Sequence, residues 1–334
     1  VGIDQIINNA AKIRQMSGGQ FPIPIVFRGP TASAGQLGAT HSQAFDNWFA
    51  NCPGLKVIVP SNPYDAKGLL KSAIRDDAPV IFMESEQMYG DKGEIPVSEY
   101  TLPIGVADIK RKGKDATIVS FGKIIKEAYI AADKLADEGV ECEIIDLRTI
   151  RPLDYDAIFD SVKKTNRLVI LEEAWPFGNI STDISHTVQS KLFDYLDAPV
   201  EKVNNADTPT PYSPVLLKEW LPDSNDVYKA VKKVLKYLED ISIPVKGDMI
   251  DQIASKSTNK TKLLCEKHLL VGTPKTLFNG GVHMYQAGDA GLSFYMENAT
   301  TRFVLCECQR GFPRRALNGC VLCNIGDRLW GTVY

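Results

Sequence analysis

The chain has 334 residues, of which 44% are hydrophobic and 24% charged, and its formal net charge at pH 7 is -3. A length of this order allows roughly two domains. The charge balance excludes a strongly basic nucleic-acid or membrane-surface binder, and no apolar run reaches the ~18 residues that a membrane span needs. Cysteines gather towards the C-terminus, which favours a reducing compartment for the main body of the chain.

The first predicted element is a helix over residues 3–16, because apolar residues recur there at helical spacing. Gly18 and Gly19 follow it, as glycines commonly do at a helix C-terminus. Only two residues precede the helix and no capping residue introduces it. We therefore expect the chain to be truncated at its N-terminus, with a genuine terminal helix as the alternative.

Strands and helices then alternate. Runs rich in Ile and Val predict three strands, at residues 22–29, 55–61 and 78–86. Between the last two, a helix is predicted at 62–77, with Ser61 or Asn62 as its cap. Such alternation is typical of a parallel sheet covered on both faces. Gly, Pro and charged residues break the pattern over 90–103 and indicate a linker.

A second alternating unit follows. The apolar runs predict strands at 115–122, 140–150, 166–175 and 198–205, and the amphipathic segments predict helices at 123–139, 154–165, 180–196 and 224–239. The predicted fold class is therefore α/β, with parallel-sheet three-layer domains. We place the domains at 1–97 and 104–239, joined by a linker at 98–103. Weak periodicity over 240–334 predicts a tail with an unknown fold or no stable fold.

One loop, "GPTASAGQLGATHSQAF" at residues 29–45, consists mainly of small side chains that cannot fill a core. A loop this thin lets the backbone approach a ligand closely. It leads to His41, whose imidazole titrates near neutrality and can hydrogen-bond an oxyanion or transfer a proton. From the residues alone, a structural histidine is the alternative interpretation.

Several segments carry a resemblance to a known family: "PIPIVFRGP", "ATHSQAF", "NCPGLKVIVPSNPYDAKGLLKSAIRD", "IDLRTIRPLD" and "LEEAWPFG". In this order they resemble the beta subunits of the decarboxylating component of pyruvate dehydrogenase, which are thiamine diphosphate enzymes of the transketolase-like class. The similarity runs from about residue 3 to residue 239. "FRGP", "NWFANCPG" and "ESEQMYG" resemble the pyruvate enzyme more than the branched-chain 2-oxoacid enzyme.

The resemblance implies a partial pyrimidine-binding domain followed by a transketolase C-terminal-type domain. It also implies an α2β2 heterotetramer with an alpha subunit, thiamine diphosphate and Mg2+ shared between the subunits, and docking to a dihydrolipoyl acyltransferase core. The expected reaction is the oxidative decarboxylation of pyruvate and acetyl transfer to lipoamide, in bacterial cytoplasm or the mitochondrial matrix. His41 occupies the place of the family's active-site histidine. The alternatives are a branched-chain 2-oxoacid or acetoin dehydrogenase beta subunit, and a noncatalytic truncated assembly module.

The family's thiamine-activating glutamate belongs to a segment upstream of the helix at 3–16. Glu84 and Glu86 lie on a later strand and do not replace it by position. We therefore assign no cofactor-binding residue to this chain and expect it to be inactive by itself.

The resemblance further implies a potassium site formed by a strand carbonyl and the end of the next helix, at Ile25, Ala73, Ile74, Asp76 and Ala78. Oxygen ligands suit such a hard cation, although an ordinary helix C-terminus is the alternative. In the tail, two close pairs of cysteines are a possible zinc site, at Cys306, Cys308, Cys320 and Cys323. For the strand-end pair Glu172 and Glu173 we favour a structural role.

Overall fold

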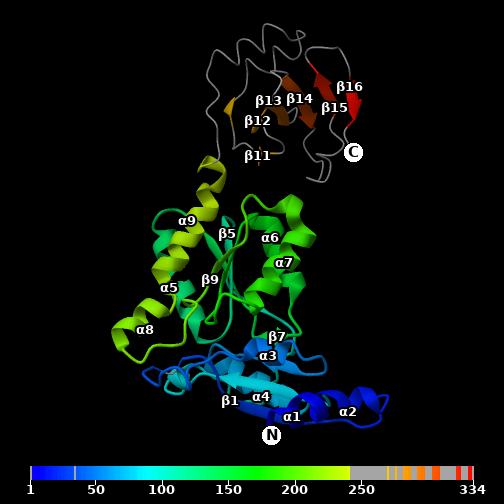
Figure 1. Ribbon diagram of the computed structural model, residues 1–334, viewed down its shortest axis with the longest axis vertical. Coiled ribbons are helices and arrows are strands. Elements are labelled where there is room, and N and C mark those ends of the chain that lie inside the picture. Colours follow the sequence, from blue (N-terminus) through cyan, green and yellow to red (C-terminus); the bar gives the residue numbers. More distant parts are fainter. Residues whose placement is uncertain are drawn as a thin grey trace. The chain divides into compact units, whose positions relative to one another are not determined.

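The computed structural model describes residues 2–33 and 35–240, and beyond them only the strand segments 269–270, 275–276, 281–286, 292–297, 303–308, 321–324 and 330–332. The chain divides into two compact units, residues 1–234 and 235–334 (Figure 1). Within the described part, no helix is both long enough and apolar enough to cross a membrane.

The chain begins with the predicted helix, which contains an irregular middle. It consists of α1 (Gly2–Asp4), a π-helical stretch η1 (Gln5–Ala10) and α2 (Ala11–Met16). The glycines after it have φ of 62° and 86°, a left-handed conformation that other residues adopt at a cost. The Gly19 N–H donates to the Arg14 carbonyl at 2.8 Å, which ends the helix as the sequence predicts.

A four-stranded sheet follows in the order β1-β3-β2-β7. Its strands are β1 (Val26–Pro30), β2 (Lys56–Ile58), β3 (Val80–Glu84) and β7 (Thr149–Arg151). The first three strands are parallel, as predicted. They are accompanied by α3 (Asp46–Ala50), α4 (Pro63–Ile74) and the short η2 (Glu86–Met88). The side chain of Asn62 accepts the Asp65 N–H at 2.9 Å and caps α4, which confirms one of the two predicted caps.

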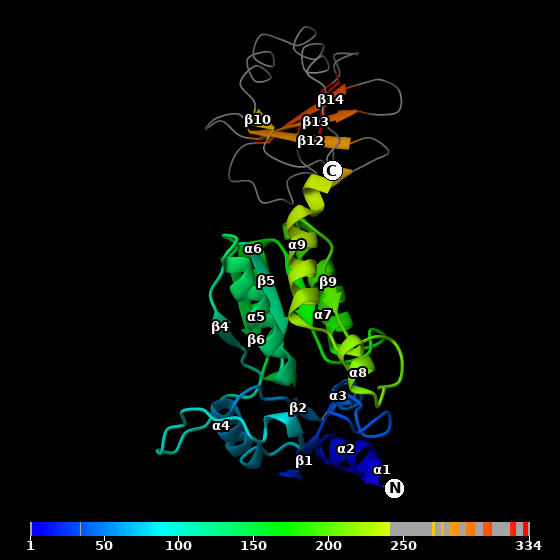
Figure 2. The ribbon, with the colours of Figure 1, turned by 90° about the vertical axis from the view of Figure 1, so that its left-hand side faces the viewer.

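Alternation along the strands gives this sheet two apolar faces. Ile58, Val80 and Phe82 pack with Leu69 and Ala73 of α4. The alternate residues point the other way, into a larger cluster that also contains Ala11 of α2 and Ala50 of α3. Figure 2 accordingly shows α4 and α2 on opposite sides of β1 and β2.

A five-stranded sheet has the order β4-β6-β5-β8-β9. Its strands are β4 (Asp108–Arg111), β5 (Ala116–Ser120), β6 (Cys142–Asp146), β8 (Leu168–Leu171) and β9 (Glu201–Val203). All are parallel except β4, an edge strand that the sequence analysis missed. The helical elements of this half are η3 (Gly122–Ile124), α5 (Ile125–Ala136), α6 (Tyr155–Thr165), α7 (Ile180–Leu192), η4 (Phe193–Tyr195), α8 (Pro214–Trp220) and α9 (Ser224–Asp240).

Helices cover both faces of the five-stranded sheet. Figure 1 shows α6 and α7 on one side and α5 and α9 on the other. The α/β class with parallel sheets between helices is therefore confirmed. Two short α-helices, α3 and α8, were not predicted.

The single strand predicted at 140–150 is wrong. The ladder of β6 ends at Asp146, and Arg148 has a φ of 57°, so the chain turns sharply. β7 then joins the other sheet, where it runs antiparallel to β2. The predicted linker lies between the two predicted domains. The part of the chain after the linker nevertheless supplies β7 to the four-stranded sheet of the part before it. The boundaries 1–97 and 104–239 remain a prediction.

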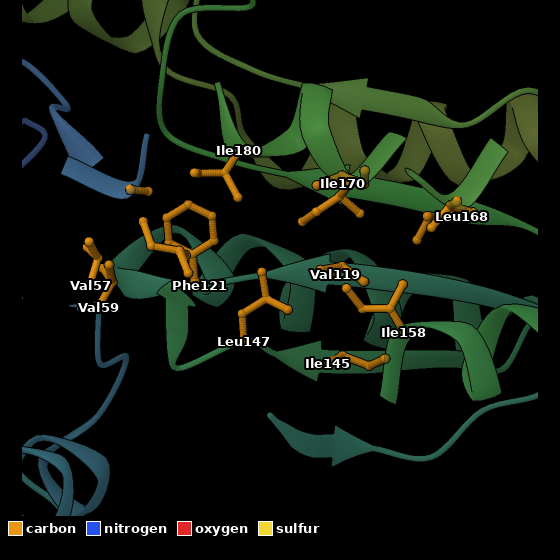
Figure 3. Close-up of a cluster of buried hydrophobic side chains, with 14 of the residues drawn as sticks. Val57, Val59, Val119, Phe121, Ile145, Leu147, Ile158, Leu168, Ile170 and Ile180 are labelled. Atoms are coloured by element: carbon orange, nitrogen blue, oxygen red, sulfur yellow. The ribbon is translucent and has the colours of Figure 1, made fainter. Parts of the chain in front are cut away.

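Both sheets contribute to one hydrophobic core. Val57 and Val59 from the first half belong to the same buried cluster as Phe121 and Leu147 from the second. Figure 3 shows the two valines beside Phe121 at the end of this cluster, which continues along the five-stranded sheet to Leu168. Residues 1–234 therefore fold around a shared interior.

The second unit contains an antiparallel sheet that the sequence analysis missed. Its path is β10-β12-β13-β14-β15-β16, and β11 pairs with β12. The strands are β10 (Leu269–Leu270), β11 (Lys275–Thr276), β12 (Gly281–Gln286), β13 (Leu292–Glu297), β14 (Phe303–Cys308), β15 (Val321–Asn324) and β16 (Trp330–Thr332). The stability of 240–334 remains a prediction. The zinc prediction at Cys306, Cys308, Cys320 and Cys323 lies outside the residues whose side chains are described.

A buried charge cluster joins the two halves beside the shared core. Arg148 donates to Asp65 of α4 and to Asp108 of β4, both at 2.7 Å. The Lys110 ammonium lies 2.9 Å from Asp65 and 2.6 Å from Asp108. Burial alone would raise the pKa of Asp65, but the hydrogen bonds from Arg148 and Lys110 outweigh it and the pKa is lowered.

Asp146 lies beside this cluster, but its neighbours stabilise its charged form less than those of Asp65 do. It accepts the Ser61 hydroxyl and the Arg148 N–H. Burial raises the pKa of Asp146 to about 6, partly offset by those hydrogen bonds, and the charge of Asp65 adds to the rise. Three carboxylates here, Asp65, Asp108 and Asp146, face only two cations.

We predict that Arg148→Met lowers the free energy of unfolding by about 3–5 kcal/mol, because it leaves the buried Asp65 without its main partner. Arg75 provides a matched control, since it pairs with Glu99 in an exposed ion pair. Arg75→Met should cost less than about 1 kcal/mol. Urea denaturation followed by circular dichroism measures both values. Similar losses for the two variants would contradict the structural role of the cluster.

The second prediction concerns pH. Because burial raises the folded-state pKa of Asp146 from its ordinary value of 3.8 to about 6, its contribution to stability is complete below pH 3.8 and is lost as the pH rises through about 6. Asp146→Asn does not titrate and keeps the shape of the side chain. The stability of this variant relative to the wild type should therefore rise by about 2 kcal/mol between pH 4 and pH 7. Denaturant titrations across this range would show a constant difference if the raised pKa were wrong.

Candidate active site

The loop that leads to His41 is closed at its neck. The Thr31 hydroxyl donates to Asp46 at 3.0 Å, and the Ala32 N–H donates to the Gln43 carbonyl at 3.0 Å. The Thr31 N–H also donates to the Glu84 carbonyl at 2.8 Å, which fixes the loop to the end of β3. The loop thus leaves β1 and returns to α3 through one tight connection. Ala34 lies outside the described residues.

Two glycines explain why the loop is built of small residues. Gly35 and Gly38 have φ of 106° and 76°, which side chains rarely tolerate. A Cβ at Gly38 would in addition lie 3.6 Å from the Tyr212 ring, which packs against the loop from the second half. At these two positions, glycine is therefore favoured by the backbone conformation.

His41 lies on the exposed side of this loop. Its N–H donates to the Gly38 carbonyl at 3.3 Å. No side chain among the described residues hydrogen-bonds or ion-pairs with its imidazole. The ring is therefore available to a ligand, whereas a structural histidine would be expected to have a buried partner.

The part of the loop that precedes His41 contacts two side chains beneath it, Lys123 and Glu173, which sequence reasoning did not connect with it. Ser33 is fully buried, and its N–H and hydroxyl donate to Glu173 Oε1 at 2.8 and 2.6 Å. Lys123 donates to the Ser33 carbonyl, to its hydroxyl at 2.9 Å and to Gln87 at 2.9 Å. Lys123 and Glu173 form an ion pair at 3.1 Å. Lys123 was missed, although it lies just beyond the end of β5, as Glu173 lies just beyond β8, and strand ends are where α/β proteins build sites.

Two further carboxylates are buried near the neck. Burial raises the pKa of Asp46 to about 7; the Thr31 hydrogen bond lowers it, and the charges of Glu172 and Glu173 raise it. Glu172 accepts the N–H groups of Ile180 and Ser181 at 3.2 and 2.8 Å, at the start of α7. This capping contact supports the structural role expected for Glu172. Glu173, by contrast, belongs to the loop's support.

The space on the inner side of the loop is too small for a cofactor. The cavity lined by Thr31, Asp46, Lys123 and Glu173 has a volume of about 20 Å³, room for about one water molecule. A larger hollow of about 1190 Å³ runs past Trp48, Tyr155 and Phe177, and no pattern in the sequence predicted it.

The five residues of the predicted potassium site gather around the end of α4 and the start of β1, but several of their oxygens have partners. The Ile25 carbonyl accepts the Val80 N–H at 2.9 Å, and the Ala73 carbonyl accepts the Asp76 N–H at 3.3 Å. The Asp76 carboxylate accepts the Ala78 N–H at 2.8 Å and pairs with the Lys56 ammonium. The carboxylate of the one acidic residue of the set thus already has partners within the protein.

Metal ligands of other kinds are not gathered either: in the described part of the chain, no three His, Cys, Asp or Glu residues are grouped so as to hold a metal ion. Potassium remains a prediction that depends on backbone carbonyls, including those of Ile25, Ala73 and Ile74.

Comparison with known families matches two segments of the chain. Residues 3–92 match the family described as "Transketolase, pyrimidine binding domain", and residues 105–227 match "Transketolase, C-terminal domain". Among solved structures, a split-gene transketolase described as an inactive beta4 tetramer aligns with 70% of this chain and 71% of its own. The TM-score is 0.58 and the identity 21%, a likeness of fold.

Curated relatives are considerably more similar. The pyruvate dehydrogenase E1 component subunit beta of Rhizobium meliloti is 52% identical over 70% of this chain and 51% of its own length. The protein of the same name from Rickettsia felis is 49% identical over 70% of this chain and 72% of its own. The Bacillus subtilis acetoin:2,6-dichlorophenolindophenol oxidoreductase subunit beta is 47% identical over 70% of this chain and 68% of its own.

The chain thus spans between about half and three quarters of the length of these relatives. Both matched domains, their order and the high identity agree with the resemblance in the sequence. The chain belongs to the transketolase-like family that includes the beta subunits of the pyruvate dehydrogenase E1 component.

Proposed function

We propose that this chain acts as part of a pyruvate dehydrogenase E1 beta subunit, in the oxidative decarboxylation of pyruvate and the transfer of the acetyl group to lipoamide. The observation that carries the proposal is the exposed imidazole of His41 on a loop whose neck and legs are fixed by hydrogen bonds. The names of the relatives at about 50% identity supply the reaction.

Thiamine diphosphate with Mg2+ is the cofactor that the family implies. The residues present fit it as one wall of a site: the loop is thin, its glycines permit close approach, and His41 is exposed on it. The small inner cavity leaves the rest of the site to another chain, which we take to be the alpha subunit. When bound, this cofactor supplies the carbon nucleophile that attacks 2-oxo acids.

His41 acts on the oxygen side of the substrate in this proposal. Its imidazole donates a hydrogen bond to the oxygen that gains negative charge when the 2-oxo carbon is attacked, and it exchanges a proton with that oxygen. Beneath the loop, Ser33 and Asp46 are paired groups and leave a cavity of only about 20 Å³, which limits movement of the loop toward the interior. Both functions depend on a fixed position of the ring.

Partners follow from the same assignment. We expect an alpha subunit in an α2β2 heterotetramer and a dihydrolipoyl acyltransferase core, with the protein in a bacterial cytoplasm or in the mitochondrial matrix. In support, one relative is from the bacterium Rhizobium meliloti and another is named as mitochondrial. The 47% identical relative from Bacillus subtilis supports a second candidate function, the oxidation of acetoin.

The substrate is the first prediction here. Assembled with its alpha subunit, thiamine diphosphate and Mg2+, the whole protein should have a higher kcat/KM for pyruvate than for 2-oxoisovalerate or acetoin. Steady-state reduction of 2,6-dichlorophenolindophenol compares the three substrates on one preparation. A preference for acetoin would select the second candidate, and a preference for 2-oxoisovalerate would place the protein with the branched-chain enzymes.

The second prediction concerns His41. His41→Ala in the same assembly should lower kcat by about 10²- to 10⁴-fold, the usual contribution of a positioned acid-base group. Stability should change little, because the ring is exposed. His186→Ala on α7 is the matched control, since His186 is also exposed and lies on a different element. Normal turnover by His41→Ala would refute the assigned role.

A further inference from the structure

Side chains from the second half of the unit hold the loop that carries His41 on both of its legs, the outgoing leg before His41 and the returning leg after it. On the outgoing leg, Ser33 contacts Lys123 and Glu173. On the returning leg, the Thr210 hydroxyl donates to the Ser42 carbonyl at 2.9 Å, and both residues are buried. Ser42 directly follows His41, so this second contact fixes the backbone next to the ring.

On the outgoing leg, the contact with Lys123 uses all the N–H donors of its ammonium group. A lysine ammonium has three N–H groups, and those of Lys123 go to the Ser33 carbonyl, the Ser33 hydroxyl and Gln87. The Lys123 side chain is only 9% exposed and that of Glu173 only 5%. Burial lowers the pKa of Lys123, an effect that the charge of Glu173 opposes. A pair this deeply buried is costly to form and holds one geometry once formed.

None of these contacts contributes to the hydrogen-bond ladders of either sheet. Lys123 lies in η3 after β5, Glu173 follows β8, and Thr210 lies between β9 and α8. All three side chains instead contact the loop backbone or Ser33. Tyr212, from the same segment as Thr210, packs on the loop at Gly38. The three groups therefore determine where the loop lies relative to the five-stranded sheet.

We propose that Lys123, Glu173 and Thr210 are positioning residues for His41, which hold the two legs of its loop and thereby place the imidazole for the reaction. The inference depends on the proposed function of His41. It adds that the ring's position is set from the second half of the unit, by residues far away in sequence. A displacement of about 1 Å at a reacting group can reduce a rate about 10²-fold.

The test is a double-mutant cycle on the whole protein, assembled with its alpha subunit and cofactor. Thr210→Val removes one hydroxyl at nearly constant shape, and Glu173→Gln removes one charge. Each should lower kcat for pyruvate by about 10- to 10²-fold with little change in KM. In a His41→Ala background, the same substitutions should change kcat less than about twofold, because their effect passes through the ring. Thr210→Ser, which keeps the hydroxyl, should restore activity.

Thr165→Val is the matched control. Thr165 is equally buried and its hydroxyl contacts Thr117 and the Ser161 carbonyl, away from the loop. It should lower stability without changing kcat. Hydrogen exchange monitored by mass spectrometry should be faster over 31–46 in Thr210→Val and unchanged there in Thr165→Val.

The outcomes separate the two proposals. Normal turnover by His41→Ala would refute the proposed function. If His41→Ala is impaired but Thr210→Val and Glu173→Gln have normal kcat, or lower it equally in both backgrounds, the positioning role is wrong. Should Glu173→Gln fail to fold, Thr210→Val and Ser33→Ala still decide the question.

Discussion

The shared hydrophobic core is the constraint on which the rest of the unit depends. Val57 and Val59 at the end of the four-stranded sheet are buried with Phe121 and Leu147 of the five-stranded one. Apolar surface of this kind is stabilised only when water leaves it. The two sheets are therefore brought close together, and every polar group at their junction needs a partner within the protein.

Two polar clusters satisfy this requirement at different places. One contains Asp65, Arg148 and Lys110 and ties α4 to the second sheet. The other contains Ser33, Glu173 and Lys123 and ties the His41 loop to the same sheet. In both clusters, Lys or Arg side chains of the second half bind oxygen atoms of the first half. A carboxylate balances the positive charge in each. The site thus inherits its rigidity from the packing of the two halves.

The sequence predicted the local parts of this structure well. Runs such as "PVIFME" are continuous and apolar, so a buried strand was the natural interpretation, and Asn62 with Pro63 indicated the start of α4. The small residues around His41 also identified the loop. These signals depend on neighbouring residues alone, which is why they are visible in a single sequence.

The parts that failed depend on distant residues. "VECEIIDLRTI" reads as one strand, and only its pairing with β2 shows where it divides. Likewise, Ser33 lies 90 and 140 residues from Lys123 and Glu173, and Ser42 lies 168 residues from Thr210. No periodicity connects such positions. Sequence reasoning therefore found the loop but missed the groups that hold it.

Because β7 comes late in the chain but pairs with β2 of the first sheet, the order in which the chain is synthesised affects how this sheet is completed. β2 acquires its outer neighbour only when the chain has emerged from the ribosome beyond residue 151, well after both parallel strands of its own half. Until then, β2 is an edge with unpaired N–H and C=O groups, which invites pairing with other chains. Domains are generally expected to fold one after another as they emerge, but here the earlier one has to wait for the later one, and the two are completed together.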